Sequence, residues 1–197
     1  MPRLTLLLAL LAASPAFAQP RPQPRPPTLP EHDVSVTYRI EGGLQDAVPG
    51  GLPDTVRLQW DAAGRRLRVE PQGRNQVLVL DLATPRAELL DTGLRGVVSL
   101  PVRAKDVAPI AMTDARLTRR GAATVAGIDC TEYDVAEPRG RGTVCLTADG
   151  LALRGAGTVD GRRGSFTALS VAPGPVPAAA FAVPPGFMRL AIPGLIR

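Results

Sequence analysis

The chain has 197 residues, of which 23 are basic and 18 are acidic, so its net charge is +5. That length suits one domain with a single hydrophobic core. Aromatic residues make up 4% of the chain, which leaves few rings on which nucleic-acid bases could stack. We therefore expect no nucleic-acid partner.

The first eighteen residues have the pattern of a secretory signal peptide. Arg3 precedes an apolar stretch from Leu4 to Ala13, and Ala16-Phe17-Ala18 forms a small-x-small cleavage site. The apolar stretch is shorter than the roughly 18 residues of a membrane-spanning helix, and no cysteine follows it to carry a lipid. We expect cleavage after Ala18, a periplasmic protein and no transmembrane segment in the mature chain.

The next segment, residues 19–30, reads QPRPQPRPPTLP. Its prolines exclude regular helix and sheet and favour an extended polyproline conformation. We expect a linker that acts as a spacer, with a proline-rich ligand for a partner as the alternative. One β-rich domain should then occupy residues 31–190, followed by a tail at 191–197.

Within the domain, apolar and polar residues alternate, as is typical of half-buried antiparallel strands joined by tight turns. Residues 105–117 are the one stretch that could hold a helix, and we expect a short helix there, lying over the sheet. The runs predicted as strands are 34–40, 56–60, 67–69, 76–82, 87–90, 97–102, 123–127, 131–135, 142–147, 152–157 and 165–171.

Cys130 and Cys145 are the two cysteines of the chain. In an oxidising compartment such a pair favours a structural disulfide. The two lie on predicted strands joined by a hairpin loop, near enough along the arms to be cross-strand neighbours. The bond would fix the register of that hairpin, which a slip of one residue would otherwise invert.

Catalytic and metal-binding patterns are missing. The sequence has no nucleophile elbow, zinc-protease helix or phosphate-binding P-loop, and no helical pattern follows the glycine-rich run 155–161 to bind an anion. Glu31-His32-Asp33 would point to opposite faces of a strand, and Asp46, Asp54 and Asp61 match no calcium loop. We predict no catalytic residue, no metal and no cofactor.

The C-terminal segment, PGPVPAAAFAVPPGFMRLAIPGLIR, mixes apolar residues with prolines that prevent a regular helix or central strand. The segment must therefore pack in an irregular conformation. It either completes the core or forms an apolar flap over a ligand groove or a partner-binding tail.

Three segments resemble a known group: GAATVAGIDCTEYDV (121–135), GRGTVCLTADGLALR (140–154) and FAVPPGF (181–187). The group consists of uncharacterised exported bacterial envelope proteins, which are similar to the LolA/LolB-type superfamily of lipoprotein-localisation factors. The resemblance implies a curved, incompletely closed antiparallel β-sheet, or half-barrel, with one or few short covering helices. It also implies an apolar cavity on the concave side that holds acyl chains.

These observations lead to a non-enzymatic carrier of an acyl chain or other apolar ligand as the expected function. An envelope structural or protein-interaction module is the alternative, and a hydrolase that uses His32 is the weakest candidate. Lipid, lipoprotein acyl chains or an envelope protein are the expected partners. Trp60 is either a pocket wall or simply the largest core residue. The predicted apolar lining is Tyr38, Leu58, Trp60, Val69 and Leu80, with Phe181, Phe187 and Met188 as its lid.

Overall fold

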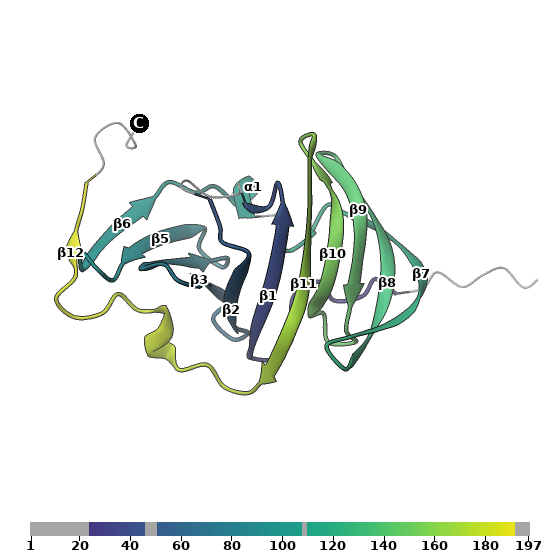
Figure 1. Ribbon diagram of the computed structural model, residues 1–197, viewed down its shortest axis with the longest axis horizontal. Helices are drawn as coiled ribbons and strands as arrows, with labels where there is room; N and C mark the ends of the chain where they lie inside the picture. The colour runs from purple at the N-terminus through teal and green to yellow at the C-terminus, as the bar shows by residue number, and fades with distance from the viewer. Residues whose placement is uncertain (1–23, 46–50, 108–109, 192–197) are drawn as a thin grey trace, which may run out of the picture.

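A computed structural model describes residues 24–45, 51–107 and 110–191 (Figure 1). The predicted signal peptide, the first part of the linker, Asp46 and all but the first residue of the predicted tail lie outside these ranges. Within them, no helix is long and apolar enough to cross a membrane.

Twelve strands form one sheet in the order β12-β6-β5-β4-β3-β2-β1-β11-β10-β9-β8-β7. All neighbours are antiparallel except β12, which runs parallel to β6. Two separate edges remain, so the sheet is not closed into a barrel, and the predicted fold class is confirmed. The strands are β1 (Val34–Gly42), β2 (Thr55–Asp61), β3 (Arg66–Pro71), β4 (Gln76–Asp81), β5 (Arg86–Asp91), β6 (Gly96–Leu100), β7 (Arg116–Val125), β8 (Ile128–Glu137), β9 (Gly140–Leu146), β10 (Ala152–Val159), β11 (Arg162–Pro173) and β12 (Met188–Arg189).

The expected short helix at residues 105–117 is present, but it is confined to the start of that stretch. The helix α1 (Ala104–Val107) has four residues, and the edge strand β7 begins at Arg116, seven residues before the predicted strand. The run Arg116 to Ala122 carries three arginines and little apolar alternation. Its extended conformation follows from pairing with β8, where Leu117 lies opposite Val135.

The segment 101–115 joins the two halves of the sheet. It connects β6, near one edge, to β7, which forms the other edge, so it must cross from one side of the open sheet to the other (Figure 1). This crossing segment includes α1 and buries Ala111 and Ala115.

The described part of the proline-rich stretch, residues 24–30, packs against the domain. The Thr28 hydroxyl donates to the Ala111 carbonyl oxygen at 2.6 Å, and the Trp60 indole N–H donates to the Pro30 carbonyl oxygen at 2.8 Å. Leu29 packs on the core, and its carbonyl oxygen lies only 2.4 Å from where a Cβ on Gly150 would be. Residues 24–30 therefore do not act as a free spacer.

Four glycines lie opposite one another across β1, β11, β10 and β9: Gly42, Gly164, Gly157 and Gly142. A Cβ at Gly142 would lie 2.3 Å from the Ala156 carbonyl oxygen, so the strands approach too closely there for any side chain. Glycine rows of this kind accompany tight bends of a sheet, and this one lies in the curved half of the molecule (Figure 1).

The predicted disulfide is confirmed. Cys130 on β8 and Cys145 on β9 are bonded, with their Cα atoms 5.5 Å apart. Cys145 lies directly opposite Glu132, so the bond joins diagonal neighbours. It fixes the register of the β8–β9 hairpin, and a structural disulfide is typical of proteins outside the cytoplasm.

Candidate functional site

Opposite sides of β1–β6 carry different side chains, because successive residues of a strand point to opposite faces. Trp60 lies opposite Val34 and Leu67, and Leu67 lies opposite Leu80. We call this side the Trp60 face. The other side, the Arg68 face, carries Arg66 and Arg68 on β3 and an apolar group on β4–β6.

On the Trp60 face, an apolar row crosses the sheet. One residue from each strand from β2 to β6 faces the next directly, and none of the five is charged or fully buried. With strands about 4.8 Å apart, the row is roughly 19 Å long. We call it the apolar row; its members are Leu58, Val69, Leu78, Leu89 and Val98.

The five predicted lining residues, Tyr38, Leu58, Trp60, Val69 and Leu80, all share the Trp60 face. Leu58 and Val69 belong to the apolar row, while Leu80 is buried beside it. Sequence reasoning missed the other three members of the row. These three residues could have been predicted from the run 76–82, which is apolar on both faces, and from the apolar residues of the two strands that follow it.

Tyr38 is buried within the packed part of the sheet. Its hydroxyl donates to the Ala152 carbonyl oxygen at 2.6 Å, and its ring meets the ring of Phe166 edge to face, with the centroids 5.6 Å apart. Burial raises the pKa of Tyr38 well above its usual value. The side chain therefore stays a neutral donor at physiological pH.

Trp60 is also buried, with 5% of its surface exposed. Its indole N–H is satisfied by Pro30 of the proline-rich stretch, and its ring belongs to the main core with Val36 and Val56. Trp60 is thus a core residue that the segment 24–30 covers, and it lies two positions along β2 from Leu58 of the apolar row.

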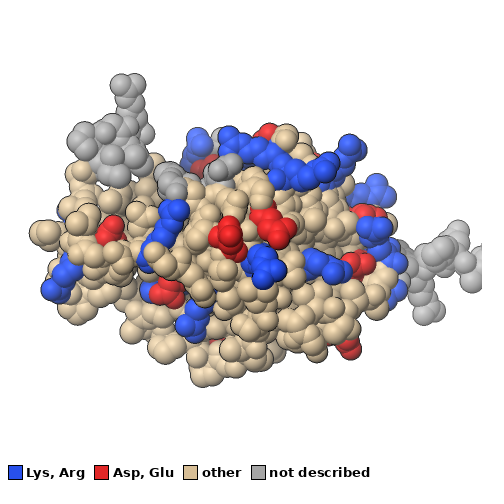
Figure 2. Space-filling view, in the orientation of Figure 1, with Lys and Arg blue, Asp and Glu red and all other residues tan. Residues whose placement is uncertain are grey.

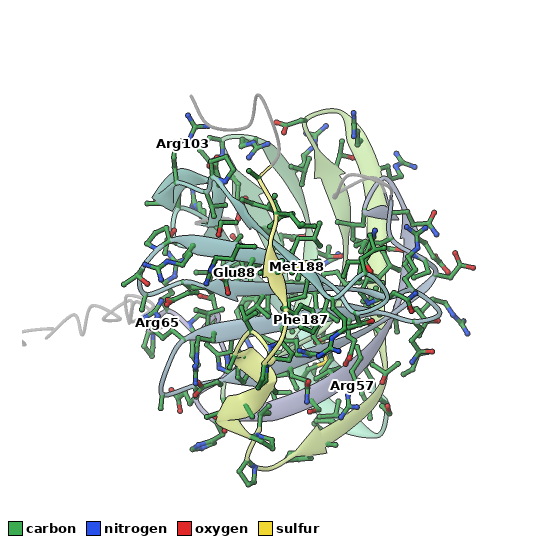
Figure 3. The ribbon with its side chains drawn as sticks, turned by 90° about the vertical axis from the view of Figure 1, so that its left-hand side faces the viewer. Arg57, Arg65, Glu88, Arg103, Phe187 and Met188 are labelled. Carbon is green, nitrogen blue, oxygen red and sulfur yellow. A yellow bond between two sulfur atoms is a disulfide. The ribbon has the colours of Figure 1, made fainter. Side chains whose placement is uncertain are left out.

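The three predicted lid residues lie elsewhere. Phe181, at the end of the 3-10 helix η2 (Ala178–Phe181), is buried against the apolar group of the Arg68 face, and Phe187 packs on the same cluster. Met188 is 64% exposed on β12. The structure thus places Phe181 and Phe187 on the opposite side of the sheet from the predicted lining, whereas Met188 lies beside Gly96 at the β12 edge, where Figure 3 labels it. The apolar group that Phe181 covers is Val77, Val79, Leu90 and Val97.

Charged side chains of β3 hold this C-terminal segment in place. The Arg66 guanidinium lies over the Phe181 ring, 4.8 Å from its centroid, and Arg68 donates to the Ala180 carbonyl oxygen at 2.8 Å. Arg66 also pairs with Asp61, whose pKa is lowered first by the backbone N–H of Gly64 and further by Arg66. This ionic cluster holds the segment against β3.

The two best-formed pockets among the described residues are small. One, of about 230 Å³, is lined mainly by polar groups such as Arg39, Glu41 and Asp54. The other, of about 160 Å³, lies beside Phe181 on the Arg68 face. Neither is an enclosed apolar cavity of the kind that the resemblance implies. Where the structure describes the chain, no group of three or more His, Cys, Asp or Glu side chains could hold a metal ion.

No protein-family model and no curated protein matches the chain. Among solved structures, an uncharacterised conserved protein from Thermus thermophilus matches 81% of this chain and 90% of its own, with 12% identity and a TM-score of 0.53. The two chains share a fold.

A putative outer membrane lipoprotein-sorting protein domain from Vibrio parahaemolyticus matches 78% of this chain and 91% of its own, with 10% identity and a TM-score of 0.40. MucB, in the MucA/MucB complex of Pseudomonas aeruginosa, matches 74% of this chain at 16% identity and a TM-score of 0.40. This chain spans about half of MucB, 53% of its length. The solved structures that the chain matches thus include a lipoprotein-sorting protein domain.

Proposed function

We propose that the protein is an exported, periplasmic, non-enzymatic binding protein that holds an acyl chain or a similar apolar ligand along the apolar row. The half-burial of this row is the observation that carries the proposal. Five apolar side chains stand side by side without full cover, and each methylene of a ligand buried against them would contribute about 0.8 kcal/mol. Export would follow cleavage after Ala18, and the disulfide agrees with an oxidising compartment.

The ligand would lie on the open sheet, since neither of the two small pockets is an enclosed apolar cavity. The row is long enough for an extended acyl chain, and residues 24–30 cover Trp60 next to it on the same face. Hydrophobic burial without a reactive group implies binding and release and no covalent chemistry.

Native mass spectrometry of protein purified from a periplasm without detergent, coupled to lipid extraction, tests the proposal. We expect a bound species that leaves with organic solvent. Titration with oleate should change the fluorescence of Trp60, which is the single tryptophan of the chain. A clean apo mass together with a flat titration of folded protein would refute the proposal.

Substitutions within the row sharpen this test. Leu78→Gln and Leu89→Gln place an amide in the middle of the row and should weaken oleate binding at least tenfold. Leu169→Gln is the matched control, because Leu169 is an exposed leucine on β11 outside the row. Equal affinity in the row variants and the control would exclude the row as the site.

A second candidate is an envelope module that binds another protein, and an exposed apolar patch favours it. Leu94, Met188 and Leu190 are 71%, 64% and 42% exposed, and they gather at the β6–β12 edge, where Met188 N–H donates to the Arg95 carbonyl oxygen. A protein that crosslinks to the chain in the periplasm, and is lost when residues 188–197 are deleted, would support this role.

A further inference from the structure

One end of the sheet is rich in arginine. β7 starts at Arg116, the turn between β8 and β9 carries Arg139 and is followed by Arg141, and the turn between β10 and β11 is followed by Arg162 and Arg163. Because β7 to β11 are consecutive antiparallel neighbours, the start of β7 and these two turns lie at the same end of the strands. Figure 2 shows basic side chains in a nearly continuous band along this upper edge of the molecule.

The strand register aligns three of these arginines. Arg163 lies opposite Thr158, Thr158 opposite Arg141, Arg141 opposite Ala136, and Ala136 opposite Arg116. All three arginines therefore point from the same face, one on every second strand and about 10 Å apart. We call Arg116, Arg141 and Arg163, together with the neighbouring Arg162, the basic rim.

The rim keeps its charge free for a partner. Arg139 is paired with Asp160, whereas the four rim arginines are exposed and form no ion pair with any residue in the described ranges. Further acids lie at this end: Glu41, Asp54, Asp106, Asp114 and Glu137. Burial, followed by the nearby Asp114, raises the pKa of Glu137.

The opposite end of the strands is acidic. Glu31 precedes β1, Asp129 follows the β7–β8 turn, and Asp149 lies in the β9–β10 turn. Within β7 to β11, a basic end and an acidic end give a charge gradient along the strands. Such a gradient orients a protein at a negatively charged surface with the arginines foremost.

An exposed apolar side chain lies at the tip of the β10–β11 turn. Val159, the last residue of β10, is 48% exposed and lies opposite Arg162. Because it directly follows Thr158, it points to the face opposite that of Arg116, Arg141 and Arg163. Guanidinium groups bind phosphate oxygens in pairs, and an apolar side chain at the same end of the strands can enter the boundary between lipid headgroups and acyl chains. Arginines with an exposed valine at the tip of the neighbouring turn fit this boundary better than they fit an acidic peptide, which would leave the valine in water.

We propose that the basic rim docks the protein on the phosphate headgroups of an anionic membrane surface. This docking is independent of the apolar row, since it needs a lipid surface and no extracted acyl chain.

Vesicle flotation tests the proposal. The wild-type protein should float with vesicles of equal parts phosphatidylglycerol and phosphatidylcholine at low salt, and should not float with phosphatidylcholine alone. The triple variant Arg116→Gln, Arg141→Gln, Arg163→Gln should bind the anionic vesicles roughly tenfold to a hundredfold more weakly. Salt at about 0.5 M should also weaken the binding of wild type to the anionic vesicles, because salt screens exposed charges.

A control triple variant, Arg57→Gln, Arg65→Gln, Arg86→Gln, removes the same charge from exposed arginines of β2, the β2–β3 turn and β5, which are not part of the rim. Figure 3 labels Arg57 and Arg65. The affinity of this control variant for the anionic vesicles should stay within about threefold of the wild-type affinity. A small loss is expected because the net charge falls. An equal loss in both triple variants would show attraction by net charge alone and overturn the proposal. No flotation of wild type with anionic vesicles, or tight binding of poly-glutamate in place of vesicles, would also overturn it.

The single variant Val159→Ser provides a second measurement that leaves the charge intact. It should weaken vesicle binding severalfold, and this loss should persist at high salt because it concerns apolar insertion. Unchanged binding by Val159→Ser would limit the contact to charge and contradict the interfacial docking proposed here.

Discussion

The indole N–H of Trp60 donates a hydrogen bond of 2.8 Å to the carbonyl oxygen of Pro30. The donor belongs to β2, in the first half of the sheet, and the acceptor ends the proline-rich stretch. The adjacent Glu31 N–H donates to the Asp149 carbonyl oxygen in the β9–β10 turn. One short stretch of chain thus ties two distant parts of the open sheet together.

Trp60→Phe should show the contribution of this contact. The substitution keeps an aromatic ring in the core and removes the donor, so the Pro30 carbonyl loses its partner and a small cavity forms. We expect the free energy of unfolding to fall by about 1–3 kcal/mol. Urea denaturation followed by circular dichroism measures it, with Leu169→Ala as an exposed control. A variant as stable as wild type would show that residues 24–30 contribute nothing to the fold.

The buried Tyr38 makes stability depend on alkaline pH. Its folded pKa is raised by burial, while the unfolded pKa stays near 10. The stabilisation is therefore fully present below about pH 10 and is lost as pH rises toward the folded pKa, at up to about 1.4 kcal/mol per pH unit.

Tyr38→Phe should remove this dependence and lower stability at neutral pH by about 1 kcal/mol, because the hydrogen bond to Ala152 is lost. Urea titrations between pH 8 and pH 11 compare the two proteins, with these pH values chosen to bracket the tyrosine pKa. If the free energy of unfolding changed with pH in the same way in wild type and Tyr38→Phe, Tyr38 would not be the source of the pH dependence.

Loss of the disulfide should destabilise the β8–β9 hairpin. Cys130 and Cys145 are 15 residues apart, and the chain-entropy model gives about 3 kcal/mol for a closed loop of that size. The double variant Cys130→Ser, Cys145→Ser should therefore melt at a clearly lower temperature. Reductant should lower the melting temperature of the wild type to a similar value and leave the double variant unchanged. A wild type insensitive to reductant would argue against a stabilising bond.

The C-terminal segment offers a direct comparison of two apolar residues. Phe181→Ala removes a ring that is buried on the Arg68 face beneath Arg66, and we expect a loss of about 3–5 kcal/mol. Met188→Ala truncates an exposed side chain seven residues later and should change stability by less than about 0.5 kcal/mol. Thermal and urea unfolding measure both. Similar small effects would mean that the segment is a loosely held flap.

Several features could be predicted from local patterns because they depend on residues close in the chain. Alternation located eleven of the twelve strands, although it placed the start of β7 seven residues late, and it gave no sign of the two-residue β12. The positions of Cys130 and Cys145 on the arms of one hairpin predicted their bond. Alternation also assigned Tyr38, Leu58, Trp60, Val69 and Leu80 to one face, since hairpin partners in register share a face.

The sequence by itself therefore determined the strands, the disulfide and the apolar side of the first half of the sheet, because the period of two and short turns encode them locally. Only the tertiary structure decided what covers each side. The segment 24–30 lies against Trp60, while Phe181 and Phe187 cover the Arg68 face. Apolar residues among prolines carry no period that assigns them to a face, so long-range packing decides where they lie. The basic rim arises in the same way, because antiparallel pairing brings arginines from three separate stretches of chain to one end of the sheet.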